Sequence, residues 1–201
     1  MTGLLGPGVA ARRPDACGNA CGYDPEGAKF VLAQAFPEGG APGVHIDYFD
    51  EPSGREAAIA GAIAANLIAV GIPAELRAHP FDQYGAVVTS GKAEVFRFGW
   101  IGAFASPDAY LDPLFASNGS DNVFALADAD VDAALGAARG ATDDATRTTA
   151  VLRAEDRVIE LNVVVPIVQY RTHLVVSPQV RDVVMRHDGT FDAERITLTA
   201  S

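Results

Sequence analysis

Short β-like runs alternate with helical patterns between residues 44 and 98, and this alternation constrains the fold more than any other feature of the sequence. Residues 44–49 (VHIDYF) alternate as a strand does, and residues 74–78 and 94–98 are two more β-like runs. Between the runs we expect two helices, one begun by a capping box at residues 53–56 and ended by Gly71, the other ending at Gly91. The order strand, helix, strand, helix, strand predicts an α/β layer with right-handed crossovers.

Helix signals also occur on both sides of this region. Asp24 followed by Pro25 is typical of a helix start, with aspartate as the N-cap and proline at the first helical position. Further along, Asp128 or Asp130 can cap another helix. Residues 142–144 then begin a longer helix, with acidic residues in its first turn to oppose the helix dipole.

The two ends of the chain carry weaker signals. Residues 1–22 are rich in glycine, proline and arginine and are expected to form an irregular lead-in. The near-continuous apolar run at 163–168 predicts a buried strand despite Pro166, and residues 174–176 predict a further strand. Residues 195–198 near the end are also β-like.

Trp100 is the one tryptophan of the chain, and it stands between Gly99 and Gly102, just past the run at 94–98. An α/β sheet places its ligands beyond the carboxyl ends of its strands. We therefore expect the indole ring to form a wall of a binding cleft, and the alternative is a tryptophan of the core.

Charge and hydropathy exclude several classes of partner. The chain has 26 acidic and 15 basic residues, a net charge of -11, and no basic run that would attract nucleic acid. No apolar run reaches the length of a membrane span. Leu4 and Leu5 are followed at once by Gly-Pro-Gly, so no signal-peptide core is recognisable. These features predict a cytoplasmic protein or a piece that lacks its export signal.

The two cysteines, Cys17 and Cys21, lie close together in the lead-in. Two cysteines cannot complete a structural zinc site, and the four histidines are scattered without ligand spacing, so no metal is expected. A local disulfide, which would imply an oxidising compartment, and a pair of free thiols in a turn both remain open.

Catalytic motifs are missing from the sequence. It contains no glycine-rich phosphate loop, no GxSxG elbow and no HExxH pair. The paired acids at 143–144 and 155–156 fall in helices and are expected on solvated faces rather than in acid–base chemistry. This pattern favours a binding protein without a cofactor over an enzyme.

Residues 97–115, RFGWIGAFASPDAYLDPLF, contain a recognisable pattern. They resemble GW-x-A-D-Y-P-D-P-D-N-F-L-x-P-L-F of the extracytoplasmic solute-binding proteins of peptide-type ABC transporters, the dipeptide- and oligopeptide-binding family. The positions that match without a gap are Gly99, Trp100, Pro107, Asp108, Leu111, Pro113, Leu114 and Phe115. Residues 23–29 (YDPEGAK), 71–76 (GIPAEL) and 166–171 (PIVQYR) resemble the same family in the same order. The chain is thus identified as a member of solute-binding family 5, in its C-terminal portion.

This resemblance implies a fold and a division of the chain. The expected fold is a periplasmic-binding-protein-like (type II) lobe, a mixed sheet flanked by helices. Family members are more than twice as long, and their chain builds one lobe, crosses a hinge, builds a second lobe and returns to the first. Residues 1–22 would then lie near the hinge, residues 23–171 would form the C-terminal lobe, and residues 172–201 would return toward an N-terminal lobe absent from this chain.

The resemblance also implies a function. The expected protein is the substrate-binding component of an ABC importer, which encloses a peptide or another small solute between two lobes and delivers it to the membrane permease. Its partners would be the ligand, the permease subunits and the missing lobe, and the full-length protein would be extracytoplasmic, in the periplasm or at the cell surface as a lipoprotein. A lone lobe offers half a cleft, so it should bind weakly and expose an apolar face. The alternative is an orphan or degenerate lobe that acts as an interaction module without transport.

The same comparison implies which residues contact the ligand. The expected contact residues are Arg97, Trp100, Gly102, Ala103, Phe104, Gln169 and Tyr170. The indole can cover a peptide backbone or a sugar face. Arg97 could hold a ligand carboxylate or be a surface charge, and strand alternation would point only one of Gln169 and Tyr170 inward. Tyr110 and Phe115 are assigned to the core.

One position departs from the family pattern. Many peptide binders carry an aspartate three residues after this tryptophan, where it pairs with the free amino terminus of the ligand. Here that residue is Ala103, and Phe104 follows in place of tyrosine. Without the carboxylate there is no charge-assisted hydrogen bond to an ammonium group. This predicts a weak preference for free peptide amino termini, or a ligand that is not a peptide.

Overall fold

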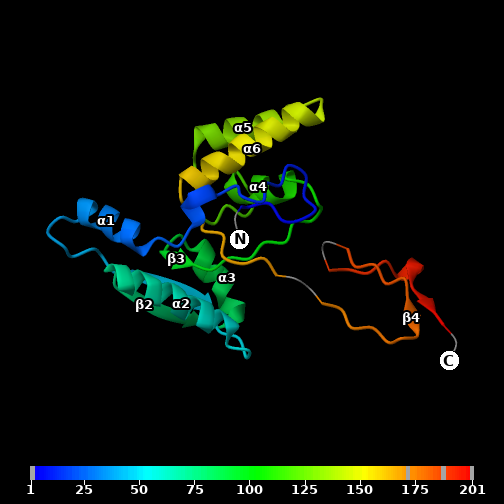
Figure 1. Ribbon diagram of the computed structural model, residues 1–201, viewed down its shortest axis with the longest axis horizontal. Coiled ribbons are helices and arrows are strands. Elements are labelled where there is room, and N and C mark those ends of the chain that lie inside the picture. The colour runs from blue at the N-terminus through cyan, green and yellow to red at the C-terminus, as the bar shows by residue number, and fades with distance from the viewer. Residues whose placement is uncertain (1–2, 171–172, 187–188, 200–201) are drawn as a thin grey trace. The chain divides into compact units, whose positions relative to one another are not determined.

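The computed structural model describes residues 3–170, 173–186 and 189–199. The chain divides into two units, one formed by Gly22–Gly99 and the other by Met1–Cys21 together with Trp100–Ser201 (Figure 1). The boundary between the units at Gly99 lies inside residues 23–171, whose assignment to one C-terminal lobe stays a prediction. The physical reason for the boundary is that two separate cores form, one around the sheet and one around the helices that follow Trp100.

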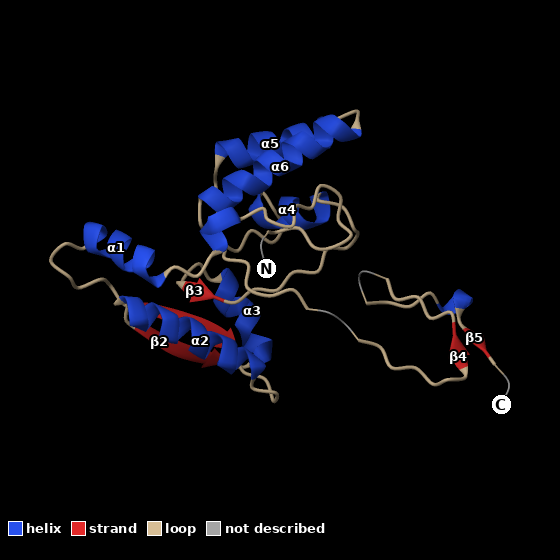
Figure 2. Cartoon of the chain, in the orientation of Figure 1, coloured by secondary structure: helices blue, strands red, loops and turns tan. Residues whose placement is uncertain are grey.

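The first unit, residues 22–99, is an α/β layer. A parallel sheet of order β2-β1-β3 carries helix α2 along its strands (Figure 2). Its elements are α1 (Pro25–Ala35), β1 (Val44–Phe49), α2 (Arg55–Val70), β2 (Ala74–His79), α3 (Phe81–Thr89) and β3 (Val95–Phe96). The register runs from Val44 opposite Ala74 to Phe49 opposite His79. The alternation of strands and helices is confirmed, whereas the described sheet is parallel throughout rather than mixed and its third strand is short.

The start of α2 differs from the predicted capping box. Gly54 is the N-cap, with no side-chain cap bond, and Glu51 supplies the acceptor instead: its carboxylate receives the N–H of Arg55 at 2.8 Å. Glu56 does not reach back to the N-cap because its side chain is fully buried. Gly71 ends the helix as predicted, with a φ of 102° that a side chain would strain.

The second unit is built mainly from three helices. They are α4 (Asp108–Phe115), α5 (Ala129–Gly140) and α6 (Asp144–Glu160), with α5 and α6 packed side by side (Figure 1). Asp128 and Asp143 cap α5 and α6, as predicted. Their buried core includes Leu111, Phe115 and Val158.

The lead-in is part of this core. It is irregular apart from a short 3-10 helix, η1 (Gly18–Cys21), yet Leu5 and Val9 are buried in the same cluster as α4, α5 and α6. Glu155 of α6 is fully buried and accepts hydrogen bonds from the Leu4 N–H and from Arg13, both at 3.0 Å. The prediction that the acids at 155–156 lie on a solvated face is therefore wrong for Glu155, because this carboxylate ties the lead-in to α6.

The segment after α6 does not form the predicted strands. Residues 163–168 and 174–176 have no strand assignment, and several of their apolar side chains are exposed: Val165, Ile167, Val168, Leu174, Val175 and Val176. A strand needs a neighbour for its N–H and C=O groups, and the described part of the chain supplies none here. The tail does contain β4 (Val180–Arg181), η2 (Ala193–Arg195) and β5 (Thr197–Leu198), with β4 and β5 antiparallel.

Among the described residues, no helix combines the length and apolar character needed to cross a membrane.

Candidate functional site

Trp100 opens the second unit directly after Gly99. Its indole N–H donates a 2.7 Å hydrogen bond to the carbonyl of Ala109 in α4. The ring is half-buried and packs against the edge of the core formed by α4, α5 and α6. One part of the indole is thus anchored, while the rest stays accessible to solvent.

The loop that follows Trp100 exposes apolar side chains. Ile101 is 72% exposed and Phe104 is 53% exposed, and Ala103 between them is also exposed. The end of the loop is anchored, because Ser106 donates to Asp108 at 3.1 Å and Arg147 of α6 pairs with the same carboxylate. The loop therefore presents a small apolar surface on a fixed base.

Gly102 and Tyr110 are in direct contact within this site. A Cβ placed on Gly102 would lie 2.5–2.9 Å from three ring atoms of Tyr110, so no larger residue fits without displacing the ring. Tyr110, assigned to the core, packs against it but is only half-buried and also lies beside the loop, whereas Phe115 is buried as predicted. Sequence reasoning missed Tyr110 because its neighbours Leu111 and Leu114 share the apolar face of α4.

Gln169 and Tyr170 are both exposed, and Tyr170 is 52% exposed. The rule that would point only one of them inward does not apply, since their segment is not a strand. The amide of Gln169 lies next to Gly6, where a Cβ would be 2.9 Å from its Nε2 atom. Gln169 is thereby brought beside the lead-in and the Tyr110 hydroxyl.

Arg97 belongs to the first unit and is engaged within it. Its guanidinium lies 2.7 Å from the carboxylate of buried Glu56, and its side chain is only 13% exposed, so it is not a surface charge. Its carbonyl accepts a 2.7 Å hydrogen bond from the hydroxyl of Tyr84. The Arg97 guanidinium thus forms an internal ion pair with Glu56 of α2.

A second polar cluster lies at the carboxyl ends of β1 and β2. Buried Asp47 lies 2.6 Å from the Nε2 atom of His79, and Tyr84 donates to the Asp47 carbonyl at 3.1 Å. Burial raises the pKa of Tyr84 to about 12, so this phenol stays a neutral donor at ordinary pH. The described residues contain no group of acids, histidines and cysteines that could hold a metal ion.

Comparison with known proteins gives these features a context. The sequence model described as "Bacterial extracellular solute-binding proteins, family 5 Middle" matches residues 1–122, which include the lead-in, the sheet and the Trp100 loop. The chain belongs to solute-binding family 5. Heme-binding protein A of Haemophilus influenzae is a curated relative, 28% identical over 178 residues that cover 85% of this chain and 32% of the relative.

Solved structures of two binding proteins have the same fold. The chain aligns over its whole length with clavulanic acid biosynthesis oligopeptide binding protein 2, at a TM-score of 0.81 and 23% identity, and covers 38% of that protein. It also aligns with the peptide-binding protein of a peptide ABC transporter, at a TM-score of 0.63 and 26% identity over 72% of this chain and 65% of that one. The family 5 chain thus spans about a third of the curated relative and has a type II periplasmic-binding fold, as the sequence predicts.

In this family 5 chain the two cysteines are bonded. The Cys17–Cys21 disulfide closes the small loop that contains η1, and no described cysteine is free. The bond immediately precedes Gly22, where the chain passes from the second unit to the first.

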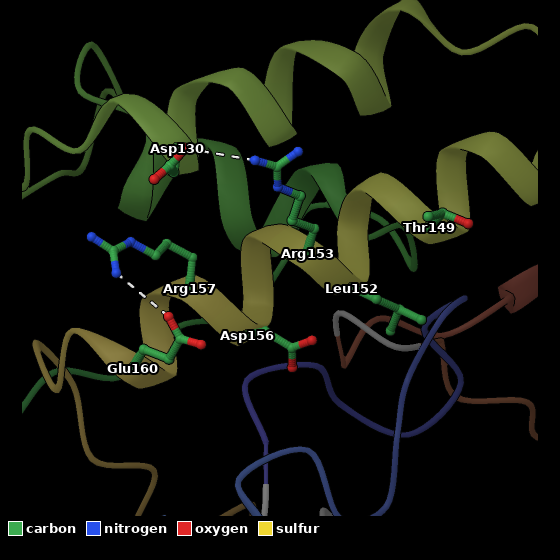
Figure 3. A pocket seen from close by; sticks show the side chains of 7 residues that line it. All are labelled: Asp130, Thr149, Leu152, Arg153, Asp156, Arg157 and Glu160. Atoms are coloured by element: carbon green, nitrogen blue, oxygen red, sulfur yellow. Dashed lines mark hydrogen bonds and ion pairs between the residues drawn. The ribbon is translucent and has the colours of Figure 1, made fainter.

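A groove on the family 5 chain lies along α5 and α6 (Figure 3). None of the residues that the sequence predicts to contact ligand lines this groove. It is lined by Asp130, Thr149, Leu152, Arg153, Asp156, Arg157 and Glu160. Its charged side chains are all engaged in ion pairs. Arg153 pairs with Asp130 at 3.6 Å and Arg157 with Glu160 at 3.4 Å, and outside the lining Arg157 also pairs with Asp128 and Asp156 with Arg13. A surface whose charges are already paired offers little to a small solute.

Proposed function

We propose that this chain is part of the substrate-binding component of an ABC importer, and that a peptide or another small solute lies against Trp100. The observation that carries the proposal is the half-buried indole, anchored to Ala109, beside a loop with two exposed apolar side chains. A fixed aromatic face flanked by apolar groups covers a ligand without demanding one particular side chain. Family membership supports the same role, since the relatives described above are binding proteins rather than enzymes.

The other half of the site is proposed to come from a lobe outside these residues. The chain covers about 32–38% of two relatives, and several apolar side chains after α6, from Val165 to Val176, are exposed. Packing of that segment on a further lobe would bury them and supply the strand neighbours they lack. Delivery to permease subunits in the membrane completes the proposal, and the disulfide supports an extracytoplasmic location, where such bonds persist.

The Trp100 wall is tested by ligand-shift thermal melts across dipeptides, oligosaccharides and metal chelates. For a ligand found in this way, Trp100→Leu is expected to weaken binding about five- to tenfold, because leucine keeps apolar volume and loses the flat aromatic face. Tyr23→Leu, an equally drastic change at a 75% exposed aromatic residue, is the control and should leave affinity unchanged. Equal affinities of wild type and Trp100→Leu, with both folded by circular dichroism, would contradict the proposal.

Ala103 determines the response to a free amino terminus. Ala103→Asp is expected to improve binding of alanyl-alanine about three- to tenfold relative to its N-acetylated form, since the new carboxylate pairs with the ammonium group. Ala105→Asp adds the same charge at another exposed position of the loop and should give no such preference. Calorimetric titration with both peptides measures the ratio, and a ratio unchanged by Ala103→Asp would sink this assignment.

The alternative function is that of an orphan or degenerate lobe, which acts as an interaction module without transport. It predicts a chain that binds none of the solutes in the melt panel while remaining folded.

A further inference from the structure

Two polar side chains of the second unit converge on one point beside the Trp100 loop. A Cβ placed on Gly6 would lie 2.9 Å from Nε2 of Gln169 and 3.9 Å from the hydroxyl oxygen of Tyr110. The two groups come from segments about 60 residues apart, α4 and the stretch after α6. Gly6 is itself buried, and because it has no side chain the Gln169 amide can lie close to its backbone.

Neither group has a protein partner within residues 3–170, 173–186 and 189–199. The hydroxyl of Tyr110 and the side-chain amide of Gln169 make no hydrogen bond to any of these residues. Tyr110 is half-buried and Gln169 is exposed, so the hydroxyl and the amide are both available to donate hydrogen bonds to a ligand atom.

The position of the hydroxyl is fixed by its surroundings. The ring of Tyr110 lies against Gly102, and the preceding residue, Ala109, receives the indole hydrogen bond of Trp100. The hydroxyl is therefore held at a set distance from the aromatic wall. The family pattern quoted above has phenylalanine at this position, so the hydroxyl is an addition in this chain.

We propose that Tyr110 and Gln169 form a polar corner that donates hydrogen bonds to a carbonyl or carboxylate oxygen of the bound solute. Both donors are neutral, so the corner selects an acceptor oxygen by geometry rather than by charge. Ala103 has no polar group with which to bind the ligand. The polar corner would supply hydrogen bonds to the ligand at another point of the same site. This inference rests on the proposed function, because it requires a ligand against Trp100.

The test is a nuclear magnetic resonance titration of the full chain with N-acetyl-alanyl-alanine, which carries acceptor oxygens and no free amino group. We expect the indole N–H signal of Trp100 and the side-chain amide signals of Gln169 to shift together. Tyr110→Phe and Gln169→Leu should each weaken binding about three- to tenfold, the effect of one lost hydrogen bond. Tyr23→Phe and Gln83→Leu make the same chemical changes at exposed sites of the first unit and should have no effect.

The outcomes separate the two proposals. If the Trp100 signal shifts and Trp100→Leu weakens binding, while Tyr110→Phe and Gln169→Leu bind as the wild type does, the polar corner is wrong and the proposed function stands. If neither the Trp100 signal nor any Gln169 signal moves at saturating peptide, both proposals fail for this ligand class. Non-additive losses in the double variant would support one shared acceptor atom.

Discussion

Glu155→Ala is expected to lower the free energy of unfolding of the second unit by about 3–5 kcal/mol, the range found when one partner of a buried ion pair is removed. The carboxylate is fully buried and receives both the Leu4 N–H and the Arg13 guanidinium. Alanine would leave the Leu4 N–H without its acceptor, remove one of the two carboxylates that Arg13 binds (the other is Asp156), and leave a cavity where the side chain was. The lead-in, whose Leu5 and Val9 belong to the core, should detach first.

The loss of stability can be measured through Trp100, because it is the one tryptophan of the chain and packs against this core. Its fluorescence in a urea titration reports unfolding of the second unit. The control is Glu160→Ala in the same helix, whose carboxylate is 67% exposed and pairs with Arg157, and which should cost less than about 1 kcal/mol. A loss for Glu155→Ala as small as that of the control would show that the buried carboxylate is not a structural tie.

Glu56→Ala is expected to destabilise the first unit by a similar amount, about 3–5 kcal/mol. Its carboxylate is fully buried in α2, 2.7 Å from Arg97 and 3.2 Å from Arg55. Arg55 is largely exposed and can be solvated, whereas the Arg97 side chain is 13% exposed and would remain as a buried cation. The cost therefore comes mainly from Arg97.

If the buried Arg97 cation causes the loss, removing its charge as well should restore stability. The double variant Glu56→Leu/Arg97→Met should recover most of the lost stability, since an apolar pair of similar volume removes both charges at once. Amide hydrogen exchange of β1 gives the readout, because the strand lies at the centre of the sheet and opens only when the unit does. Glu38→Ala, at an exposed position, is the control. A double variant as unstable as Glu56→Ala would exclude the buried cation as the cause.

The two glutamates also explain why the polar residues of this chain were hard to assign from sequence. Glu56 has the spacing of a capping box, and Glu155 stands next to Asp156 in a pair that looks solvated. Each is instead drawn into the interior by an arginine far along the chain, Arg97 or Arg13. Periodicity within a helix carries no information about a partner 41 or 142 residues away.

Local chemistry by itself determined most of the secondary structure. Asp24, Asp128 and Asp143 cap helices because each carboxylate reaches N–H groups two or three residues ahead. Gly71 ends α2 because the helix needs a left-handed residue there. The order of strands and helices, and the pattern around Trp100, then led to the α/β fold and the family. Each of these features depends on residues that are close together in the chain, so it can be recognised from a single sequence.

Tertiary structure alone decided the rest. The apolar run at 163–168 has the composition of a buried strand but lacks a neighbouring strand among the described residues, and Val165, Ile167 and Val168 stay exposed. Tyr110 reads as core from its helical face, yet contact with Gly102 places it beside the Trp100 loop. Hydrogen bonds, ion pairs and burial depend on what the folded chain brings next to a residue, and that is a property of the whole arrangement rather than of any local stretch.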